Sequence, residues 1–212
     1  MYNYEKFKET YLKEHPDLPY LISYPRTGSH WLRMIMESYL KIPCLSRGFL
    51  VDRTSSFWAT HGHDKEVQLN LPKGPVIYLY RNPVDVVYSE LIYDFGSAED
   101  HVESYAFTYK RHLIKWLGLA EKYPKKIHSL TYEDLKRNAC QEIGLLLGFL
   151  KYHIDDDLIK ESIKGITKSR VNSSTVHDPK VINNSNTYQE NKRIFKERNI
   201  DLFQQGFVEL RL

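Results

Sequence analysis

Short apolar runs alternate along the chain with longer segments in which apolar residues recur at helical spacing. The runs at 20–24, 76–80 and 127–131 are rich in β-branched and aromatic residues, and proline borders the first two. Runs of this length and composition are typical of buried strands. A shorter strand is expected at 57–60, ending at 61–63.

Helices are predicted between these strands. Apolar residues at helical spacing predict an amphipathic helix over 29–41. Asn82 followed by Pro83 is a favoured start for another helix. The remaining expected helices cover 4–14, 100–122, 133–150 and 156–164. Because strands that alternate with helices favour a parallel sheet covered on both faces, we expect a three-layer α/β fold.

The chain has 212 residues, a length that fits one domain. We expect this domain to span 1–212, with its core at about 20–150. From about 165 onward the sequence becomes polar and irregular, so 165–212 is predicted to be a lid or a peripheral segment. The sequence contains no long apolar run and no targeting signal at its start, so we expect a cytoplasmic protein with no membrane partner.

Charge and cysteine content exclude several other classes. The net charge is +3 and the pI is about 8.6, which is well short of the charge typical of a nucleic-acid binder. Cys44 and Cys140 have no metal-ligand spacing and are too few for a disulfide framework. We therefore expect no nucleic-acid partner and no metal. A local site for a small anion is enough to account for the charge.

The turn between the first strand and the helix at 29–41 has the composition of an anion site. It reads Tyr-Pro-Arg-Thr-Gly-Ser-His-Trp over 24–31. Free backbone N–H groups and the helix dipole attract anions at such a helix start. Arg26 adds a full charge and Ser29 a hydroxyl. The turn lacks the Gly-Lys-Ser/Thr ending of a Walker A loop, and on its own a plain strand-to-helix turn explains it equally well.

A second candidate segment follows the strand at 76–80. Arg81 stands at the carboxyl end of that strand, the edge at which open α/β sheets bind ligands. Ser89 follows eight residues later, about two helical turns on, so that both side chains can face one phosphate. The alternative is that Asp85 pairs with a surface arginine and Ser89 is simply solvated.

Taken together, these segments resemble the sulfotransferase family, which uses 3′-phosphoadenosine 5′-phosphosulfate (PAPS). Pro25 to Trp31 takes the place of the family's Pro-Lys-Ser-Gly-Thr-Thr-Trp loop, which holds the 5′-phosphosulfate. Arg81 and Ser89 match the family's Arg-Asn-Pro motif and the serine that contacts the 3′-phosphate. The segment 131–135 resembles the family's Tyr-Glu-Asp-Leu segment, whose tyrosine lies near the adenine. The three matches occur in the family's order, over about 20–150.

The resemblance implies a fold, a reaction and a set of site residues. The implied fold is the three-layer parallel sheet of the P-loop NTPase-like sulfotransferases. The implied reaction is metal-free, in-line transfer of the sulfuryl group of PAPS to a hydroxyl, less often an amine, of a small-molecule acceptor, which leaves PAP. The implied cofactor-binding residues are Arg26, Thr27, Gly28, Ser29, His30, Trp31, Arg81, Ser89 and Tyr132.

The acceptor hydroxyl needs a base, and the leaving oxygen needs a stabilising charge. Many family members carry a catalytic histidine in a Lys-Thr-His segment between the two cofactor motifs, and Ala59-Thr60-His61 falls there. We therefore expect His61 to be the base. His63 is a rival, because in an extended segment it points to the same face. Arg26 is the second expected catalytic residue, because it can stabilise the leaving oxygen.

The sequence departs from the family pattern at several places. Arg26 and Ala59 stand where lysine is usual, and His30 where threonine is usual. The family's cationic Arg-Lys-Gly segment near the C-terminus has neutral counterparts here, Phe-Gln-Gln-Gly at 203–206. The cations that we expect to compensate are Arg211 or the Lys192-Arg193 pair.

Several questions stay open at this stage. A non-catalytic module that binds nucleotide or a partner, and a small-molecule kinase, are the alternative functions. The acceptor pocket is expected from the segments at about 43–60 and 91–108, whose aromatic residues suit either a pocket or a core. The identity of the acceptor cannot be read, and a homodimer is a further option.

Overall fold

A computed structural model describes residues 4–52, 54–175, 186–207 and 210. Within these residues, four parallel strands form one sheet in the order β2-β1-β3-β4. The strands are β1 (Tyr20–Ser23), β2 (Thr60–Gly62), β3 (Val76–Tyr80) and β4 (Ile127–Thr131). β1 therefore lies between β2 and β3, and their carboxyl ends meet at one edge.

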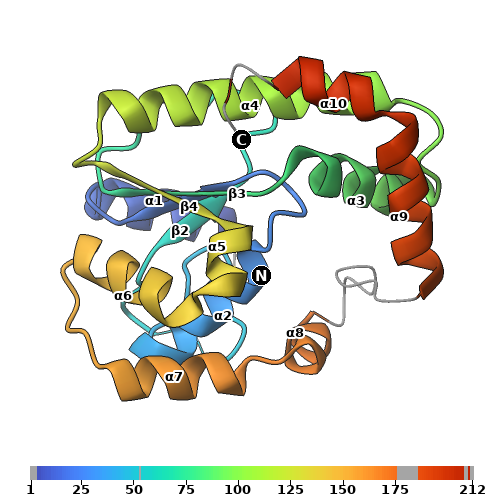
Figure 1. The fold of residues 1–212 in the computed structure, drawn as a ribbon. Coiled ribbons are helices and arrows are strands. Elements are labelled where there is room, and N and C mark those ends of the chain that lie inside the picture. Colours follow the sequence, from blue (N-terminus) through green and yellow to red (C-terminus); the bar gives the residue numbers. More distant parts are fainter. Residues whose placement is uncertain (1–3, 53, 176–185, 208–209, 211–212) are drawn as a thin grey trace.

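Helices cover both faces of the sheet, so the expected three-layer α/β architecture is confirmed (Figure 1). One face carries α2 (Ser29–Leu40), α5 (Tyr132–Arg137), α6 (Ala139–Phe149), α7 (Asp156–Gly165) and α8 (Lys168–Ser174). The opposite face carries α3 (Pro83–Phe95), α4 (Val102–Lys122), α9 (Asn186–Arg198) and α10 (Ile200–Phe207). The remaining helix, α1 (Tyr4–Glu14), packs its aromatic residues against Phe57.

The two central strands, β1 and β3, are largely apolar because both faces of the sheet are buried there. Successive side chains point to opposite faces, so Leu21 and Ile77 join the core under α2. Ile22 and Tyr78 join the core under α3 and α4. This double burial accounts for the continuous apolar runs in the sequence.

The strand predicted at 57–60 is displaced toward the C-terminus. Trp58 and Ala59 are fully buried, but their backbone groups bond to Pro43 and Leu45 instead of β1. Pairing with β1 begins at Thr60 and gives β2 as Thr60–Gly62. The run at 57–60 is apolar because it is buried, and this composition led to the prediction of a strand. Only its last residue, Thr60, takes part in the sheet.

The helix predicted over 133–150 is divided into α5 and α6 at Asn138, whose backbone leaves the helical region. Asn82 caps α3 as expected, because its side chain accepts a hydrogen bond from the N–H of Val84 at 3.0 Å.

The irregular C-terminal segment predicted from about 165 onward is helical where the structure describes it. Thr167 caps α8, and α9 and α10 follow after the gap in the described residues. α8 and α9 are polar, and one buried side chain anchors each of them, Val171 and Phe195. α10 is more apolar and buries Phe203 and Phe207. A single anchor in each of α8 and α9 left no clear period in the sequence. Asn183 and Asn184 lie outside the described residues. The single domain and its lid or periphery remain predictions.

Within the described ranges, no helix combines the length and apolarity that a membrane crossing requires.

Candidate active site

The first two candidate segments meet at the carboxyl edge of the sheet because β1 and β3 are neighbours. Arg26 Nε donates a hydrogen bond to Ser89 Oγ at 3.1 Å. One guanidinium nitrogen of Arg81 donates to the carbonyl oxygen of Arg26, also at 3.1 Å. Two segments that are separated by 55 residues in the sequence therefore form one cationic surface.

The third segment reaches the same place through Tyr132. Gly28 has a φ of 93°, and a Cβ there would lie 2.5 Å from the Tyr132 ring, so only glycine lets the loop lie against that ring. The guanidinium of Arg81 also contacts this ring, 4.5 Å from the Tyr132 centroid. The edge of the Trp31 ring approaches Tyr132 as well. The three segments matched in sequence thus converge.

The loop at 24–31 presents backbone donors. Gly28 is the N-cap of α2, and no side chain caps the helix. The N–H of Trp31 donates to the Gly28 carbonyl at 3.0 Å, whereas the N–H groups of Ser29 and His30 precede the first intrahelical hydrogen bond and have no side-chain cap. Arg26 also has positive φ, and the Thr27 hydroxyl holds the turn by donating to the Tyr24 carbonyl at 2.8 Å. Such a turn is an anion-binding surface.

Carboxylates balance the charge of Arg81. One guanidinium nitrogen of Arg81 pairs with Asp85 at 3.1 Å. The buried Nε of Arg81 lies 4.0 Å from a carboxylate oxygen of Glu133 but makes no hydrogen bond to a described residue. Lys192 from α9 binds the other oxygen of Asp85 at 2.9 Å. Burial pushes the pKa of Asp85 upward, but Arg81 and Lys192 outweigh it and hold that pKa below its ordinary value.

The other C-terminal candidates lie elsewhere. Gln204 and Gln205 are exposed on α10, which packs against α4. Arg193 pairs with glutamates of its own helix. Arg211 lies outside the described residues. Among the expected substitutes for the family's cationic segment, the structure therefore places Lys192 beside Arg81.

Two histidines contact Ser23, the last residue of β1. His61 Nε2 lies 3.0 Å from Ser23 Oγ, and its Nδ1 lies 3.4 Å from a guanidinium nitrogen of Arg33. His63 Nδ1 lies 3.1 Å from the Ser23 carbonyl oxygen and 3.3 Å from Ser23 Oγ. The expectation that both histidines point to one face agrees with these contacts.

Burial is the main cause that lowers the pKa of each histidine in this region. The pKa of His61 falls well below its ordinary value through burial and the charge of Arg33. Burial also lowers the pKa of His63, although its hydrogen bond to Ser23 opposes the shift. His30, in the first turn of α2, has a pKa of about 3 through burial and the charges of Arg33 and Arg47. These imidazoles are therefore neutral at pH 7.

Arg33 and Arg47 lie over the ring of Phe49, at 4.6 and 5.1 Å from its centroid. Arg33 is only 3% exposed and also donates to the Arg47 carbonyl at 2.6 Å. Neither arginine forms an ion pair with a described residue. Glu37, one turn along α2 from Arg33, instead accepts hydrogen bonds from the N–H groups of Phe49 and Leu50.

Sequence reasoning missed Arg33, although a signal was present. The position falls within an amphipathic helix whose neighbours Leu32 and Met34 are fully buried. A charged residue in such a setting is rarely buried without a functional or pairing reason. Of the aromatic residues expected in the acceptor pocket, Phe49 and Tyr93 approach the site, whereas Trp58 belongs to the core.

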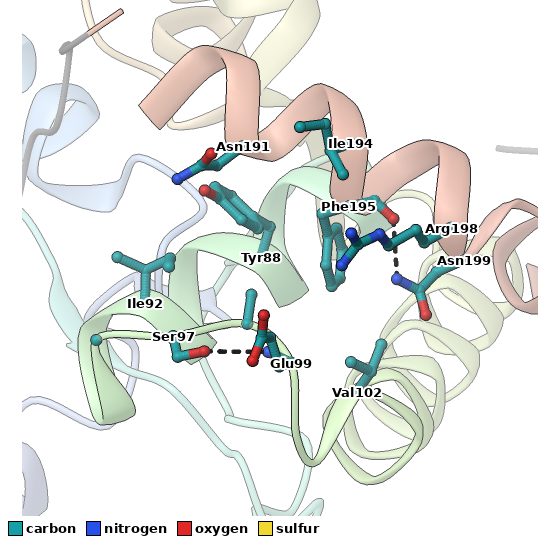
Figure 2. Close-up of a pocket in the computed structure, with 12 residues that line it drawn as sticks. Tyr88, Ile92, Ser97, Glu99, Val102, Asn191, Ile194, Phe195, Arg198 and Asn199 are labelled. Atoms are coloured by element: carbon teal, nitrogen blue, oxygen red, sulfur yellow. Dashed lines mark hydrogen bonds between the residues drawn. The ribbon is translucent and has the colours of Figure 1, made fainter. Parts of the chain in front are cut away.

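A separate cavity of about 500 Å³ lies on the far side of α3, between that helix, the α3–α4 connection and α9 (Figure 2). Its lining includes Tyr88 and Ile92 of α3 and Phe195 of α9. Ser89 and Tyr93 follow Tyr88 and Ile92 by one position and face Arg26 instead. The cavity is thus distinct from the converging motifs.

Comparison with known proteins agrees with this geometry. Residues 50–205 match the family model described as "Sulfotransferase domain". The chain is 23% identical over 203 residues to dog "Sulfotransferase 1B1", covering 76% of this chain and 67% of that protein. It is 22% identical over 242 residues to "Flavonol 3-sulfotransferase" of Flaveria bidentis, covering 84% and 76%.

The solved structure of mouse sulfotransferase SULT7A1 complexed with PAP has a similar fold. It matches with a TM-score of 0.55 and 16% identity, over 87% of this chain and 85% of that chain. The fold and the class of enzyme expected from the sequence, a transferase, are therefore confirmed. Because the family model matches well over half of its residues, the chain belongs to the sulfotransferase domain family.

Proposed function

We propose that the chain transfers the sulfuryl group of PAPS to a hydroxyl group of a small-molecule acceptor. The observation that carries this proposal is the contact between the two motifs, in which Arg26 binds Ser89 and Arg81 binds the Arg26 carbonyl. In the family these motifs hold the 5′-phosphosulfate and the 3′-phosphate. Because the two motifs are in contact, cations for both ends of a single nucleotide lie at one edge of the sheet.

Donors of the site that lack a hydrogen-bond acceptor fit such a nucleotide. The start of α2 lacks a side-chain cap, and the buried Nε of Arg81 has no hydrogen-bond acceptor among the described residues. A buried donor without a partner costs about 1–3 kcal/mol, so an anionic oxygen there is favoured. The residues that we propose for binding are those named from the sequence: Arg26, Thr27, Gly28, Ser29, His30, Trp31, Arg81, Ser89 and Tyr132.

Lys192 adds to the 3′-phosphate side. It shares Asp85 with Arg81, so it lies where a second cation can face the same phosphate. We propose that Lys192 supplies the charge that the neutral Gln204 and Gln205 do not. This favours a nucleotide-binding enzyme over a module whose nucleotide site has degenerated.

When bound, PAPS supplies an activated sulfuryl group to an in-line displacement. The chain then has to position the reactants and to stabilise the negative charge that develops on the leaving oxygen. Arg26 is suited to the second task because Ser89 and the Tyr93 ring, 4.8 Å from its guanidinium, hold its side chain in place. The N-terminus of α2 adds a fixed positive potential.

The acceptor hydroxyl must lose a proton during transfer. The histidines at Ser23 supply the proton acceptor, since both are neutral at pH 7. The sequence favours His61 for this task. Arg33 places a buried positive charge beside His61, which compensates for the lysine that Ala59 replaces.

Calorimetry with PAP and a transfer assay with radiolabelled PAPS test this function. The acceptor panel should hold phenols, primary alcohols and amines. We expect PAP to bind and sulfate to be transferred to a hydroxyl acceptor, with Arg111→Ala, an exposed arginine of α4, unchanged. Failure to bind PAP at millimolar concentration would contradict the proposal. Magnesium-dependent turnover of ATP would point to a kinase instead.

The sequence also led us to expect a cytoplasmic protein that binds no nucleic acid and acts alone or as a homodimer. These points remain predictions. Size-exclusion chromatography with light scattering measures the oligomeric state directly.

A further inference from the structure

The two histidines at Ser23 differ in which of their ring nitrogens are used. This difference bears on the base, and the inference drawn from it rests on the sulfuryl transfer proposed above. A general base needs a nitrogen lone pair that the acceptor hydroxyl can reach. The hydrogen-bond partners of each ring determine whether it has one.

Both nitrogens of His61 are engaged. A guanidinium can only donate, so Arg33 requires Nδ1 of His61 to be the acceptor. The proton of the neutral ring is then on Nε2, which donates it to Ser23 Oγ at 3.0 Å. His61 therefore has no uncommitted lone pair, and its pKa, lowered by burial and by Arg33, disfavours a second proton.

His63 has the opposite arrangement. A carbonyl oxygen can only accept, so the contact with the Ser23 carbonyl puts the proton of His63 on Nδ1. The lone pair is then on Nε2, which makes no hydrogen bond to the described residues and is not among the buried atoms without a partner. His63 is partly exposed, so we infer that an acceptor can reach this lone pair.

The backbone of His63 is held firmly. His112 of α4 donates from Nε2 to the His63 carbonyl oxygen at 2.9 Å, and Tyr78 donates its hydroxyl hydrogen to Nδ1 of His112. The next residue, Asp64, accepts hydrogen bonds from Lys115 at 2.8 Å and from Trp116 at 3.0 Å. This bracing fixes the ring beside the loop at 24–31, as a base on a short connection requires.

We propose that His63 is the general base of the transfer and that His61 is a positioning residue that acts on it through Ser23. The acceptor O–H bond breaks and its proton moves to Nε2 of His63. The acceptor oxygen forms a bond to sulfur while the bond from sulfur to the phosphate oxygen breaks. The products are the sulfated acceptor, PAP and a protonated His63, which returns its proton to solvent.

The charged and titratable groups around His63 come from every element packed against it. They are Arg33 and His30 from α2, His61 from β2, Lys65 on the same connection and His112 from α4. Burial and the two cations Arg33 and Lys65 lower the pKa of His63. The active, neutral form therefore persists as the pH falls below the ordinary histidine value, and rate is lost only as the pH passes through the lowered pKa.

The matched variants are His63→Asn and His61→Gln. The asparagine amide at position 63 can still donate to the Ser23 carbonyl, and the glutamine amide at position 61 can still donate to Ser23 Oγ, but neither titrates. We expect His63→Asn to lower kcat by about 10²- to 10⁴-fold and to abolish the acid limb of the pH–rate profile. For His61→Gln we expect a loss of about tenfold or less, with the acid limb retained but shifted.

Two further measurements separate a catalytic loss from an unfolded variant or an inactive enzyme. PAP affinity by calorimetry should stay within about twofold in both variants and in His153→Asn, an exposed histidine that serves as the control. Nitrogen-15 NMR of the histidine rings needs no acceptor. It should show the proton of His63 on Nδ1 and that of His61 on Nε2.

The assignment is overturned if His63→Asn keeps wild-type kcat, or if the NMR spectrum shows the free lone pair on Nε2 of His61. If the wild type neither binds PAP nor transfers sulfate, the proposed function itself fails and takes the base assignment with it. Transfer by the wild type that survives in His63→Asn contradicts the base alone.

Discussion

The cations on the two sides of the site differ in how their charge is balanced. On the donor side, Arg81 and Lys192 share the carboxylate of Asp85. On the acceptor side, Arg33 and Arg47 share only the face of the Phe49 ring and form no ion pair with a described residue. The cations on the donor side are thus paired with a carboxylate, whereas the two arginines on the acceptor side keep an unbalanced positive charge.

The difference matches two tasks. Paired cations keep their places through Asp85 and can turn toward the phosphates of a ligand that carries its own negative charge. A buried guanidinium without a carboxylate partner is costly to the fold, but its charge adds to burial in lowering the pKa of the neighbouring imidazoles. Under the proposed function, we therefore expect the donor side to bind the nucleotide and the acceptor side to hold the histidines in the basic form.

The largest expected effect on PAP binding comes from removing the donor-side arginine. Arg81→Ala deletes contacts to Arg26, Asp85 and Tyr132 together. Losing a charge-assisted contact costs about 1.5–3 kcal/mol, so we expect PAP to bind roughly 10- to 100-fold more weakly. Calorimetry beside Arg111→Ala checks this. Unchanged affinity would show that the donor side does not bind the nucleotide.

The free energy of unfolding at low pH should depend on different groups on the two sides. They are His112, which holds His63, on the acceptor side and Asp85 on the donor side. The pKa of the fully buried His112 is about 4 instead of 6.5. The unfolded chain takes up this proton first as the pH falls below 6.5, so stability is lost between about 6.5 and 4. At pH 5 the loss from His112 alone is about 2 kcal/mol. The lowered pKa of Asp85 acts only below its ordinary value of 3.8.

Denaturant unfolding at pH 7 and pH 5 measures this loss. His112→Gln should be less stable than the wild type at pH 7, because it loses the hydrogen bond from Tyr78 and part of its packing. It should nevertheless lose about 2 kcal/mol less than the wild type between the two pH values. An identical loss in both proteins would mean that His112 does not titrate as the structure indicates.

Removing the acceptor-side charge should shift proton affinity and spare nucleotide binding. Arg33→Met takes away a charge that lowers the pKa of His61 and of His63. We expect both pKa values to rise and the acid limb of the rate profile to move to higher pH, while PAP affinity stays within about twofold. Histidine NMR titration reads the shift, and Arg33→Lys, which keeps the charge, is the control. A large loss of PAP affinity in Arg33→Met would show that the acceptor-side charge also binds the nucleotide, and would contradict the separate tasks of the two sides.

A smaller effect on PAP binding than that of Arg81→Ala is expected at Lys192, which is partly exposed. Lys192→Ala should weaken PAP binding by about threefold to tenfold, since a partly solvated contact is worth less than a buried one. Arg193→Ala alters the next residue, whose partners are on its own helix, and should leave binding unchanged. If both variants weakened PAP binding equally, the positive charge of α9 would act by long-range attraction, and the contact of Lys192 with Asp85 would not matter for binding.

The sequence predicted the parts of this molecule that depend on local signals. Asn82 and Pro83 marked the start of α3, and the run at 76–80 matched β3 residue for residue. The three motifs could be recognised because each is a short stretch of the sequence. The contacts between them nevertheless join residues that are far apart in the sequence. The positions of His61 and His63 on one face followed from strand alternation.

Tertiary contacts explain what sequence reasoning missed. Trp58 and Ala59 bond to the 43–45 segment, a pairing that no local pattern reveals. The hydrogen bonds that separate His61 from His63 depend on Ser23 and Arg33, which come from other elements. One buried side chain in each of the polar helices α8 and α9, Val171 and Phe195, holds the helix to the core. A single apolar residue gives a weaker sequence signal than the polar residues around it.

The place of β1 between β2 and β3 has a consequence for how such an enzyme can change. The chain leaves β1 with β2, which carries His61 and is followed by His63, on one side, and with β3, which is followed by Arg81, on the other. Substitutions along β2 and its connections can therefore retune the acceptor chemistry without disturbing the hydrogen bonds that join Arg26, Ser89 and Arg81. Because β1 separates the two sides, we expect that acceptor specificity can change while the residues proposed to bind the donor stay the same.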